Sequence, residues 1–324
     1  MAKVSKKSPK KVPAAPALPA APPAPRNVLA FHSGALGDFI LTWPILLGAA
    51  RVMAQSRVIA VVPGGRGKLA EQVLRLEHRD VETGGWHKLF GGNQPDERPR
   101  KLLANSRLLI GILGKDQAKW AQAAAVAAPA AEVLLLDPPP RDLAGQHATA
   151  FLLGGLAANP ILQSAASGMV DSINKSGLLP RYHDPAGPVL LHPGSGSAKK
   201  NWPVDGWLDL ANRLRDAGRR VRVILGEVEQ ERVNADAAAA FEAVADVQRP
   251  GDLPELLFLL RGAGGYVGHD TGPTHLAATI GLPTVALFGP ATDPAVWQPL
   301  GPRVTVHQTE DLADLDPATV PLPS

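Results

Sequence analysis

Residues 268–278 read Gly-His-Asp-Thr-Gly-Pro-Thr-His-Leu-Ala-Ala. The stretch starts at the end of an apolar run that predicts a strand at 265–268, and it leads into an expected helix at 273–280. Pro273 suits the first helical position, where its fixed φ and missing N–H do no harm. A further strand is expected at 284–288. Strands that alternate with helices through short connections predict a parallel, doubly wound α/β fold.

The same alternation extends outward over most of the chain in two series. Strands are expected at 27–32, 57–62, 108–113, 132–136, 189–192, 220–225, 265–268 and 284–288. Helices are expected at 39–54, 68–76, 119–128, 204–217, 229–244, 253–261 and 273–280. Between the series, the proline-containing stretch 159–188 shows no such pattern. We therefore expect two α/β domains, residues 27–175 and 186–324, with a ligand site in the cleft between them.

Residues 1–26 differ in composition from the rest and are rich in Lys, Pro and Ala. Six prolines between residues 12 and 25 interrupt the apolar segment that a signal peptide would need. The segment is therefore expected to be a disordered, polyproline-like tail. An alternative is a weak tether to anionic lipid at the cytoplasmic membrane face, since basic residues near such a surface contribute about 1 kcal/mol each.

Composition narrows the class of protein. The chain has 324 residues, of which 45% are hydrophobic, enough for two cores. Its net charge is +3, but residues 1–26 alone carry +6, so the remainder is mildly acidic. A mildly acidic body lacks the excess of positive charge that is typical of nucleic-acid-binding proteins. The absence of cysteine excludes disulfides and cysteine nucleophiles and fits a cytoplasmic protein. No apolar run is long enough to predict a transmembrane helix.

The loop at 270–272 has the chemistry of a diphosphate site. Backbone N–H groups at Thr271 and Gly272 would be free at the positive end of the following helix, which suits a diphosphate. Gly272 would let phosphate oxygens approach the backbone, and Asp270 could accept hydrogen bonds from sugar hydroxyls. The alternative is that the loop is an ordinary helix cap with no ligand. A single histidine such as His275 more often has a structural role than contacts a ligand.

A second loop, residues 193–203, reads Pro-Gly-Ser-Gly-Ser-Ala-Lys-Lys-Asn-Trp-Pro. Ser195 and Lys200 could hold phosphate, although the spacing is not that of a Walker A loop. After the strand at 220–225, Glu229 could contact the ribose or base of a nucleotide. The alternatives are a solvated turn for the first loop and a solvated helix start for the second.

The first loop of the chain, residues 33–44, reads Ser-Gly-Ala-Leu-Gly-Asp-Phe-Ile-Leu-Thr-Trp-Pro. It lacks the Gly-x-Gly-x-x-Gly fingerprint of dinucleotide-binding folds. Asp38 could point into the cleft and serve as a general base, or it could simply cap a helix. Ser33, Gly37 and Arg66 are candidates for the acceptor side of the same cleft.

Together these segments resemble glycosyltransferase family 9, the ADP-heptose:lipopolysaccharide heptosyltransferases, over about residues 27–306. Gly37-Asp38 with Thr42 and Pro44 is similar to the family's N-terminal Gly-Asp…Thr-x-Pro motif. Lys200-Asn201-Trp202-Pro203 is similar to its Lys-x-Trp-Pro loop. Asp270-Thr271-Gly272, followed by His275 and Ala277-Ala278, is similar to its donor motif and is the most specific of the three.

The resemblance implies a GT-B fold, in which two Rossmann-like domains face a cleft, and an inverting transfer that needs no metal or cofactor. It implies that Asp38 is the catalytic base, that Lys200, Thr271 and Gly272 hold the diphosphate, and that Asp270 contacts the donor sugar. The implied partners are a nucleotide-sugar donor, most simply ADP-heptose, and a glycan or glycolipid acceptor.

Two alternatives remain at the level of sequence. One is a non-catalytic protein that binds a sugar nucleotide, and Asp38 in the expected motif favours the enzyme over it. The other is a GT-B transferase that uses a different nucleotide sugar. A GT-B epimerase would need acidic and histidine catalytic groups that the sequence does not place.

Overall fold

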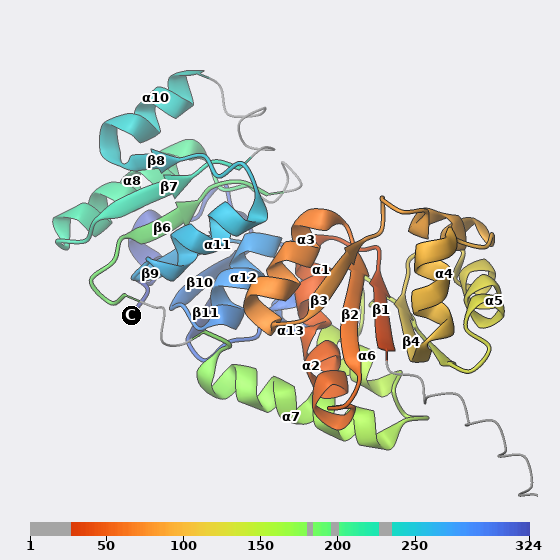
Figure 1. The fold of residues 1–324 in the computed structure, drawn as a ribbon. Coiled ribbons are helices and arrows are strands. Elements are labelled where there is room, and N and C mark those ends of the chain that lie inside the picture. Colours follow the sequence, from red (N-terminus) through yellow and green to blue (C-terminus); the bar gives the residue numbers. More distant parts are fainter. Residues whose placement is uncertain (1–26, 180–183, 196–200, 227–234) are drawn as a thin grey trace, which may run out of the picture.

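The computed structural model describes residues 27–179, 184–195, 201–226 and 235–324, which form two parallel sheets (Figure 1). The α/β fold class expected from the sequence is confirmed. All paired strands run parallel, as the βαβ pattern predicts.

The first sheet has the order β3-β2-β1-β4-β5. Its strands are β1 (Asn27–His32), β2 (Arg57–Val62), β3 (Glu77–Asp80), β4 (Ser106–Ile112) and β5 (Glu132–Leu136). The central strand β1 is buried along its whole length, and its alternate side chains enter different cores. Val28 and Ala30 pack in one core, and Leu29 and Phe31 pack in the other, so helices cover both faces.

The helices of this half are short except for the last. They are α1 (Leu36–Leu41), α2 (Trp43–Val52), α3 (Gly64–Leu69), α4 (Glu97–Ala104), α5 (Gln117–Ala127), α6 (Ala148–Gly154) and α7 (Pro160–Ser176). A π-helical turn, Ala70–Leu74, follows α3, and a 3-10 helix, Trp86–Gly91, precedes α4.

The second sheet has the order β11-β10-β9-β6-β7-β8. Its strands are β6 (Val189–His192), β7 (Val221–Ile224), β8 (Asp246–Gln248), β9 (Gly265–His269), β10 (Thr284–Phe288) and β11 (Val304–Gln308). Its helices are α8 (Val204–Asp216), α10 (Ala235–Val244), α11 (Leu253–Arg261), α12 (Gly272–Ile280) and α13 (Pro294–Trp297). After β11 the chain forms one 3-10 turn, Pro317–Thr319, and packs on α8.

Two expectations for the helices were wrong. The stretch 159–188, where the pattern was expected to lapse, contains the 17-residue helix α7, with Pro160 at its start and the Asn159 side chain accepting from the Leu162 N–H (3.2 Å). The helix expected at 39–54 is divided at Thr42 into α1 and α2. Pro44 explains the division, because it has no N–H to continue the hydrogen-bond ladder of α1.

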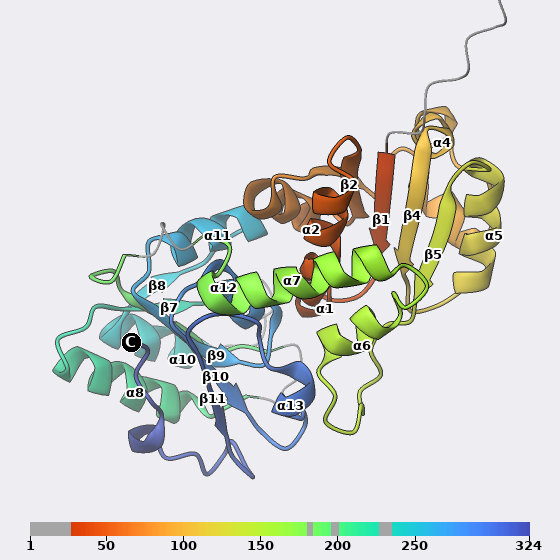
Figure 2. The same ribbon diagram turned by 90° about the horizontal axis from the view of Figure 1, so that it is seen from below.

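Helix α7 connects the two halves (Figure 2). It packs along α2 at Gly48, where an added Cβ would lie 2.8 Å from the Ala166 nitrogen. Beyond its end, the Leu178 and Leu179 N–H groups donate to the carbonyls of residues 279 and 280 in α12 (2.9 and 3.0 Å). The connection between the halves is therefore itself bonded to the second half.

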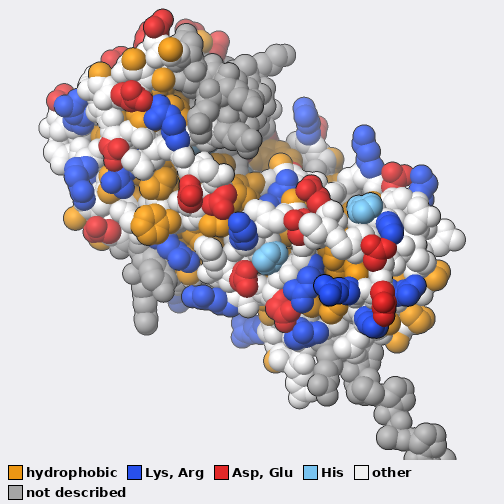
Figure 3. Space-filling view, turned by 45° about the horizontal axis from the view of Figure 1, so that its top comes forward, with side chains coloured by type: hydrophobic (Ala, Val, Ile, Leu, Met, Phe, Trp, Pro, Cys, Tyr) orange, Lys and Arg blue, Asp and Glu red, His pale blue; other side chains and the backbone are white. Residues whose placement is uncertain are grey.

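Polar contacts also join the halves near α3 and near α6. Lys68 of α3 pairs with Asp252 at the start of α11 (3.4 Å). On the α6 side, His147 Nε2 lies 2.9 Å from the Gln298 carbonyl, and Asn174 accepts from the Gly301 N–H (3.1 Å). On the face shown in Figure 3, acidic and basic side chains are interspersed over both halves.

Candidate functional site

The predicted site loops lie where the strand order of each sheet reverses. In the first sheet the reversal is between β1 and β4, and in the second it is between β6 and β9. The segment that starts at Ser33 follows β1, the segment at Pro193 follows β6, and the segment at Asp270 follows β9. In open α/β sheets, ligands bind beyond the carboxyl ends of the strands at such switch points.

Asp38 lies in the first turn of α1 and is partly exposed. Its Oδ2 accepts a hydrogen bond from the Ala35 N–H at the start of the helix (3.0 Å). The contact satisfies one of the N–H groups that a helix start leaves free. Within the described residues no hydrogen bond to Oδ1 is present, so that oxygen can receive a proton from a ligand.

Arg66 of α3 holds the same loop from the side. Its Nη1 donates to the carbonyl of Gly34. Partial burial lowers the pKa of Arg66, while the negative charges of Asp38 and Glu82 act in the opposite direction. The guanidinium therefore lies within electrostatic range of the predicted base.

Ser33 and His32 also support the loop. The Ser33 hydroxyl accepts from the Gly114 N–H (3.3 Å) and so joins the loops that follow β1 and β4. His32 is the last residue of β1, and its Nδ1 is buried with no hydrogen-bond partner among the described residues. Burial, and then the nearby Arg66 charge, lower the pKa of His32 to about 3, so this ring is neutral at physiological pH.

On the other half, Asp270 and His275 lie together at the start of α12. Asp270 Oδ1 is 3.6 Å from His275 Nε2, and only 11% and 3% of the two side chains are exposed. Thr271 has extended backbone angles at the N-cap position, and its hydroxyl lies 3.1 Å from that of Thr274. The His275 N–H donates to the Thr271 carbonyl (3.1 Å), so the hydrogen-bonded ladder of α12 starts there.

The starts of α1 and α12 meet each other across the two halves (Figure 1). A Cβ added at Gly37 would lie 3.1 Å from His275 Cδ2. A Cβ added at Gly272 would lie 2.7 Å from Leu36 Cβ. The space beside Gly272, where we expected an approaching phosphate, is thus taken by the side chain of Leu36 in this structure.

Histidine 269 is a site-supporting residue that the sequence reasoning did not assign. His269 is fully buried, and its Nε2 accepts from the Trp202 N–H (2.9 Å), while its Nδ1 is 3.4 Å from the Gly194 carbonyl. The Ser195 hydroxyl donates to Asn201 Oδ1 (2.6 Å) and holds the two ends of this loop together. A polar residue at the end of an apolar strand was the available signal, but its partner lies far away in the sequence.

Lys200 and Glu229, both predicted to contact the donor, lie outside the described residues. The remaining predicted residues form one group in each half, and the α1–α12 contact joins the groups at Gly37 with His275 and at Gly272 with Leu36. The first consists of Ser33, Gly37, Asp38 and Arg66, and the second of Ser195, Asp270, Thr271, Gly272 and His275.

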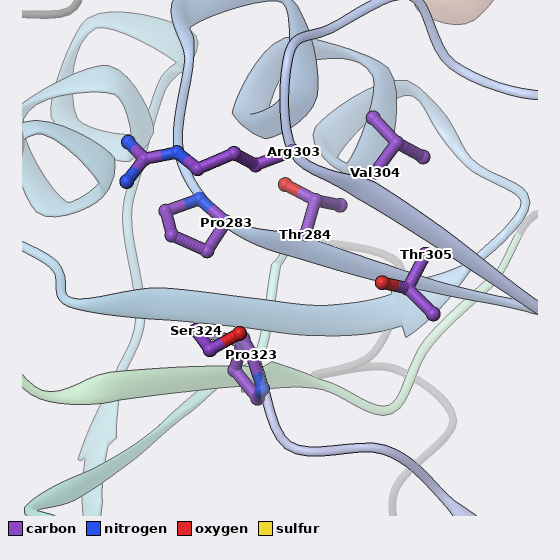
Figure 4. Close-up of a pocket in the computed structure, with 7 residues that line it drawn as sticks. All are labelled: Pro283, Thr284, Arg303, Val304, Thr305, Pro323 and Ser324. Atoms are coloured by element: carbon purple, nitrogen blue, oxygen red, sulfur yellow. The ribbon is translucent and has the colours of Figure 1, made fainter.

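Two cavities occur elsewhere on the molecule. One, shown in Figure 4, has a volume of about 160 Å³ and lies at the amino ends of β10 and β11, among Thr284, Arg303 and the C-terminal Pro323. The other has a volume of about 430 Å³ and lies between α6, α7 and residues 298–304. No predicted site residue lines either cavity. Over the described ranges, no group of three or more His, Asp or Glu side chains is arranged to hold a metal ion.

Comparison with known proteins relates these loops to one family. Residues 172–316 match the model of glycosyltransferase family 9 (heptosyltransferase). Lipopolysaccharide heptosyltransferase 1 of Pseudomonas aeruginosa is 29% identical over 307 residues, which cover 88% of this chain and 84% of the relative. The chain is thus similar to glycosyltransferase family 9 over its second half by the family model, and over 88% of its length by this relative. The namesake protein of Salmonella typhimurium is 32% identical over 41% of each chain.

Solved structures of family 9 enzymes share the fold. The E. coli heptosyltransferase WaaC with ADP superposes with a TM-score of 0.63 at 19% identity, covering 91% of this chain and 97% of the other. The E. coli ADP-heptose lps heptosyltransferase II has a TM-score of 0.64 at 16% identity, covering 91% and 96%. The chain therefore has the expected GT-B fold. In its described residues, no helix has the length and apolar character needed to cross a membrane.

Proposed function

We propose that this glycosyltransferase moves a heptose from ADP-heptose to a hydroxyl group of a lipopolysaccharide-type acceptor, with inversion at the anomeric carbon and without a metal. The observation that carries the proposal is the meeting of α1 and α12, which brings the Asp38 loop to the Asp270–Gly272 loop. The names of the family 9 relatives, which are lipopolysaccharide heptosyltransferases, support the choice of donor and acceptor.

The proposed reaction starts at Asp38. Its Oδ1 takes the proton from an acceptor hydroxyl, while Oδ2 stays bonded to the Ala35 N–H. The acceptor oxygen then forms a bond to the anomeric carbon of the donor, opposite the bond to the diphosphate, which breaks as ADP leaves. This in-line displacement inverts the configuration at that carbon.

The leaving diphosphate gains negative charge, and the second half supplies the groups to stabilise it. The N–H groups of Thr271 and Gly272 lie at the positive end of α12. Ser195 follows β6, and Lys200, which lies outside the described residues, is assigned the role of adding a positive charge. Asp270 is assigned to hydroxyls of the donor sugar.

The remaining roles follow from position. His275, beside Asp270, fixes the orientation of that carboxylate, and Glu229 is assigned to the nucleoside. On the acceptor side, Ser33, Gly37 and Arg66 surround Asp38. We place the reaction in the cytoplasm, with the protein in peripheral contact with the inner membrane where a glycolipid acceptor would be presented.

A thermal-shift screen tests the donor, because a ligand that binds only the folded protein raises its melting temperature. ADP-heptose, ADP, and matched UDP- and GDP-sugars are compared at equal concentrations, followed by a transfer assay to a lipopolysaccharide core acceptor that lacks heptose. The proposal expects the largest shift with ADP-heptose and release of ADP in the assay. A larger shift with a UDP- or GDP-sugar would reject the donor, and binding without any transfer would favour a non-catalytic binder.

A further inference from the structure

The contact between α1 and α12 depends on two glycines that lie opposite bulkier partners. Gly37 of α1 faces the ring of His275, and Gly272 of α12 faces Leu36. The contact is therefore reciprocal. His275 of α12 fills the space beside Gly37, and Leu36 of α1 fills the space beside Gly272. Gly37 is the residue before Asp38, and Gly272 lies two residues after Asp270.

The distances show how little room the contact leaves. A Cβ at Gly272 would meet Leu36 Cβ and Cγ at 2.7 Å and Cδ2 at 2.8 Å, which no packing tolerates without a shift. A Cβ at Gly37 would meet His275 Cδ2 at 3.1 Å and Nε2 at 3.5 Å. The edge of the His275 ring that faces Gly37 also carries the nitrogen that faces Asp270. A change at either glycine would therefore move a loop that the proposed reaction uses.

We propose that Gly37 and Gly272 are positioning residues whose missing side chains set the separation of the two halves, and with it the distance from Asp38 to the donor. This inference rests on the proposed function for the reaction that it serves. In this proposal, Gly272 is not a glycine in order to let a phosphate approach the backbone. The position that its side chain would occupy faces Leu36 of the other half and not open solvent.

The first test is Gly272→Ala, measured by steady-state kinetics and by calorimetry with ADP. We expect kcat to fall by at least about tenfold, because a misplacement of about 1 Å can cost about 10²-fold. The Kd for ADP should stay within about threefold, because the substitution keeps the Gly272 N–H and the added methyl group would face Leu36. Unchanged kcat would overturn the proposal, as would a loss of ADP affinity that accounts for the whole effect.

A compensating substitution makes the test specific. Leu36→Gly, combined with Gly272→Ala, removes the three Leu36 atoms that the new methyl group would meet. If spacing is the cause, the double variant regains most of the lost kcat. If Gly272 is needed by the donor phosphate instead, the double variant stays as impaired as the single one, and the proposal fails.

The spacing can also be measured without catalysis. The chain has no cysteine, so Val126→Cys and Phe258→Cys, at positions 66% and 77% exposed, provide two unique sites for spin labels on α5 and α11. We expect the distance distribution to change in Gly272→Ala and to return in the double variant. An unchanged distribution overturns the proposal. Failure of the unsubstituted protein to transfer heptose would instead reject the proposed function and leave this measurement valid.

Two further variants complete the design. Gly168→Ala is the matched control, because no atom lies within 4 Å of the Cβ it would add in α7, and it should leave kcat and the label distances unchanged. If Gly272→Ala does not fold, as judged by circular dichroism, Gly37→Ala offers a smaller displacement and should show the same loss of kcat with retained ADP affinity. Full activity of Gly37→Ala together with an unchanged label distance would overturn the proposal.

Discussion

Asp38 uses one carboxylate oxygen within the protein and has the other available for a ligand. In the proposed reaction, Asp38→Ala should abolish transfer while the Kd for ADP stays within a few-fold, because the donor loops belong to the other half. Asp38→Asn is the matched control for structure, since its side-chain oxygen can still accept from Ala35. Steady-state turnover and calorimetry measure the two quantities, and retained turnover in either variant would reject Asp38 as the base.

His32 links stability to pH. Its pKa is lowered to about 3 in the folded protein, mainly by burial, whereas an unfolded histidine has a pKa of about 6.5. Between these values the unfolded chain binds a proton that the folded chain does not, so the free energy of unfolding falls as the pH falls. The His32 contribution is fully present above about pH 6.5 and is lost as the pH decreases toward 3.

The contribution of His32 to the pH dependence of stability is tested by urea denaturation of the parent protein and His32→Leu from pH 7 to pH 4. The variant removes the titrating group and the unpartnered Nδ1 while keeping an apolar side chain against Phe39. We expect its free energy of unfolding to fall less steeply with decreasing pH than that of the parent, by up to about 1.4 kcal/mol per pH unit. Parallel curves for the two proteins would show that His32 is not the group responsible.

At the scale of elements, the loop after β6 is held by a residue of β9. His269→Phe keeps an aromatic ring near Trp207 but leaves the buried Trp202 N–H without its acceptor. An unsatisfied buried donor costs about 1–3 kcal/mol, and the loop that carries Ser195 should be less well ordered. We therefore expect a lower free energy of unfolding together with a several-fold weaker Kd for ADP.

The control for His269→Phe is His307→Phe on β11, a partly exposed position outside the predicted site. Denaturation and calorimetry on the two variants separate a general effect of the substitution from the loss of the loop anchor. Equal ADP affinity in both variants would contradict a role for His269 in the donor loop.

The elements that the sequence predicts well are the buried ones. The strands at 57–62, 132–136 and 284–288 and the helix at 253–261 have the expected bounds. Strands β3, β8 and β11 are not predicted from the sequence, because they are outer strands without a continuous apolar run and are defined by pairing with β2, β7 and β10. Helix α7 is not predicted because the stretch 159–188 contains several prolines, although Pro160 occupies the start of the helix.

For the site, the sequence indicated the loops but could not indicate their contacts. Asp38 and Asp270 follow apolar strands, and strand ends of parallel sheets share one edge, so both loops were expected in a cleft. The pairing of Gly37 with His275, and of Gly272 with Leu36, depends on how the two halves are placed. No local pattern encodes that placement, because it results from α7 and many separate contacts.

At the scale of the whole molecule, Gly177 controls how the connection from α7 reaches α12. Its φ of +66° is unfavourable for other residues, and an added Cβ would lie 2.5 Å from the Gly281 Cα. Gly177→Ala should therefore destabilise the protein by roughly 1–3 kcal/mol through backbone strain, with further loss from the clash. It should also lower kcat by disturbing the hydrogen bonds of Leu178 and Leu179 to α12.

Urea denaturation and turnover measure both effects, and Gly154→Ala, which adds a Cβ with no atom within 4 Å, is the control. A Gly177→Ala variant as stable as the parent would show that the connection adapts to a side chain. Reduced stability with unchanged kcat would show that it supports the fold without setting the site.

The α1–α12 contact also has a consequence for synthesis of the protein. Leu36 and Gly37 leave the ribosome when most of the chain, including their partners at 272 and 275, is still untranslated. At translation rates of about 5–20 residues per second, roughly 10–50 s pass between the synthesis of α1 and that of α12. During that interval the first sheet can form, but the face of α1 that α12 later covers remains open to solvent and to chaperones. Catalytic competence is thus acquired late, when the second sheet has folded around its own central strands.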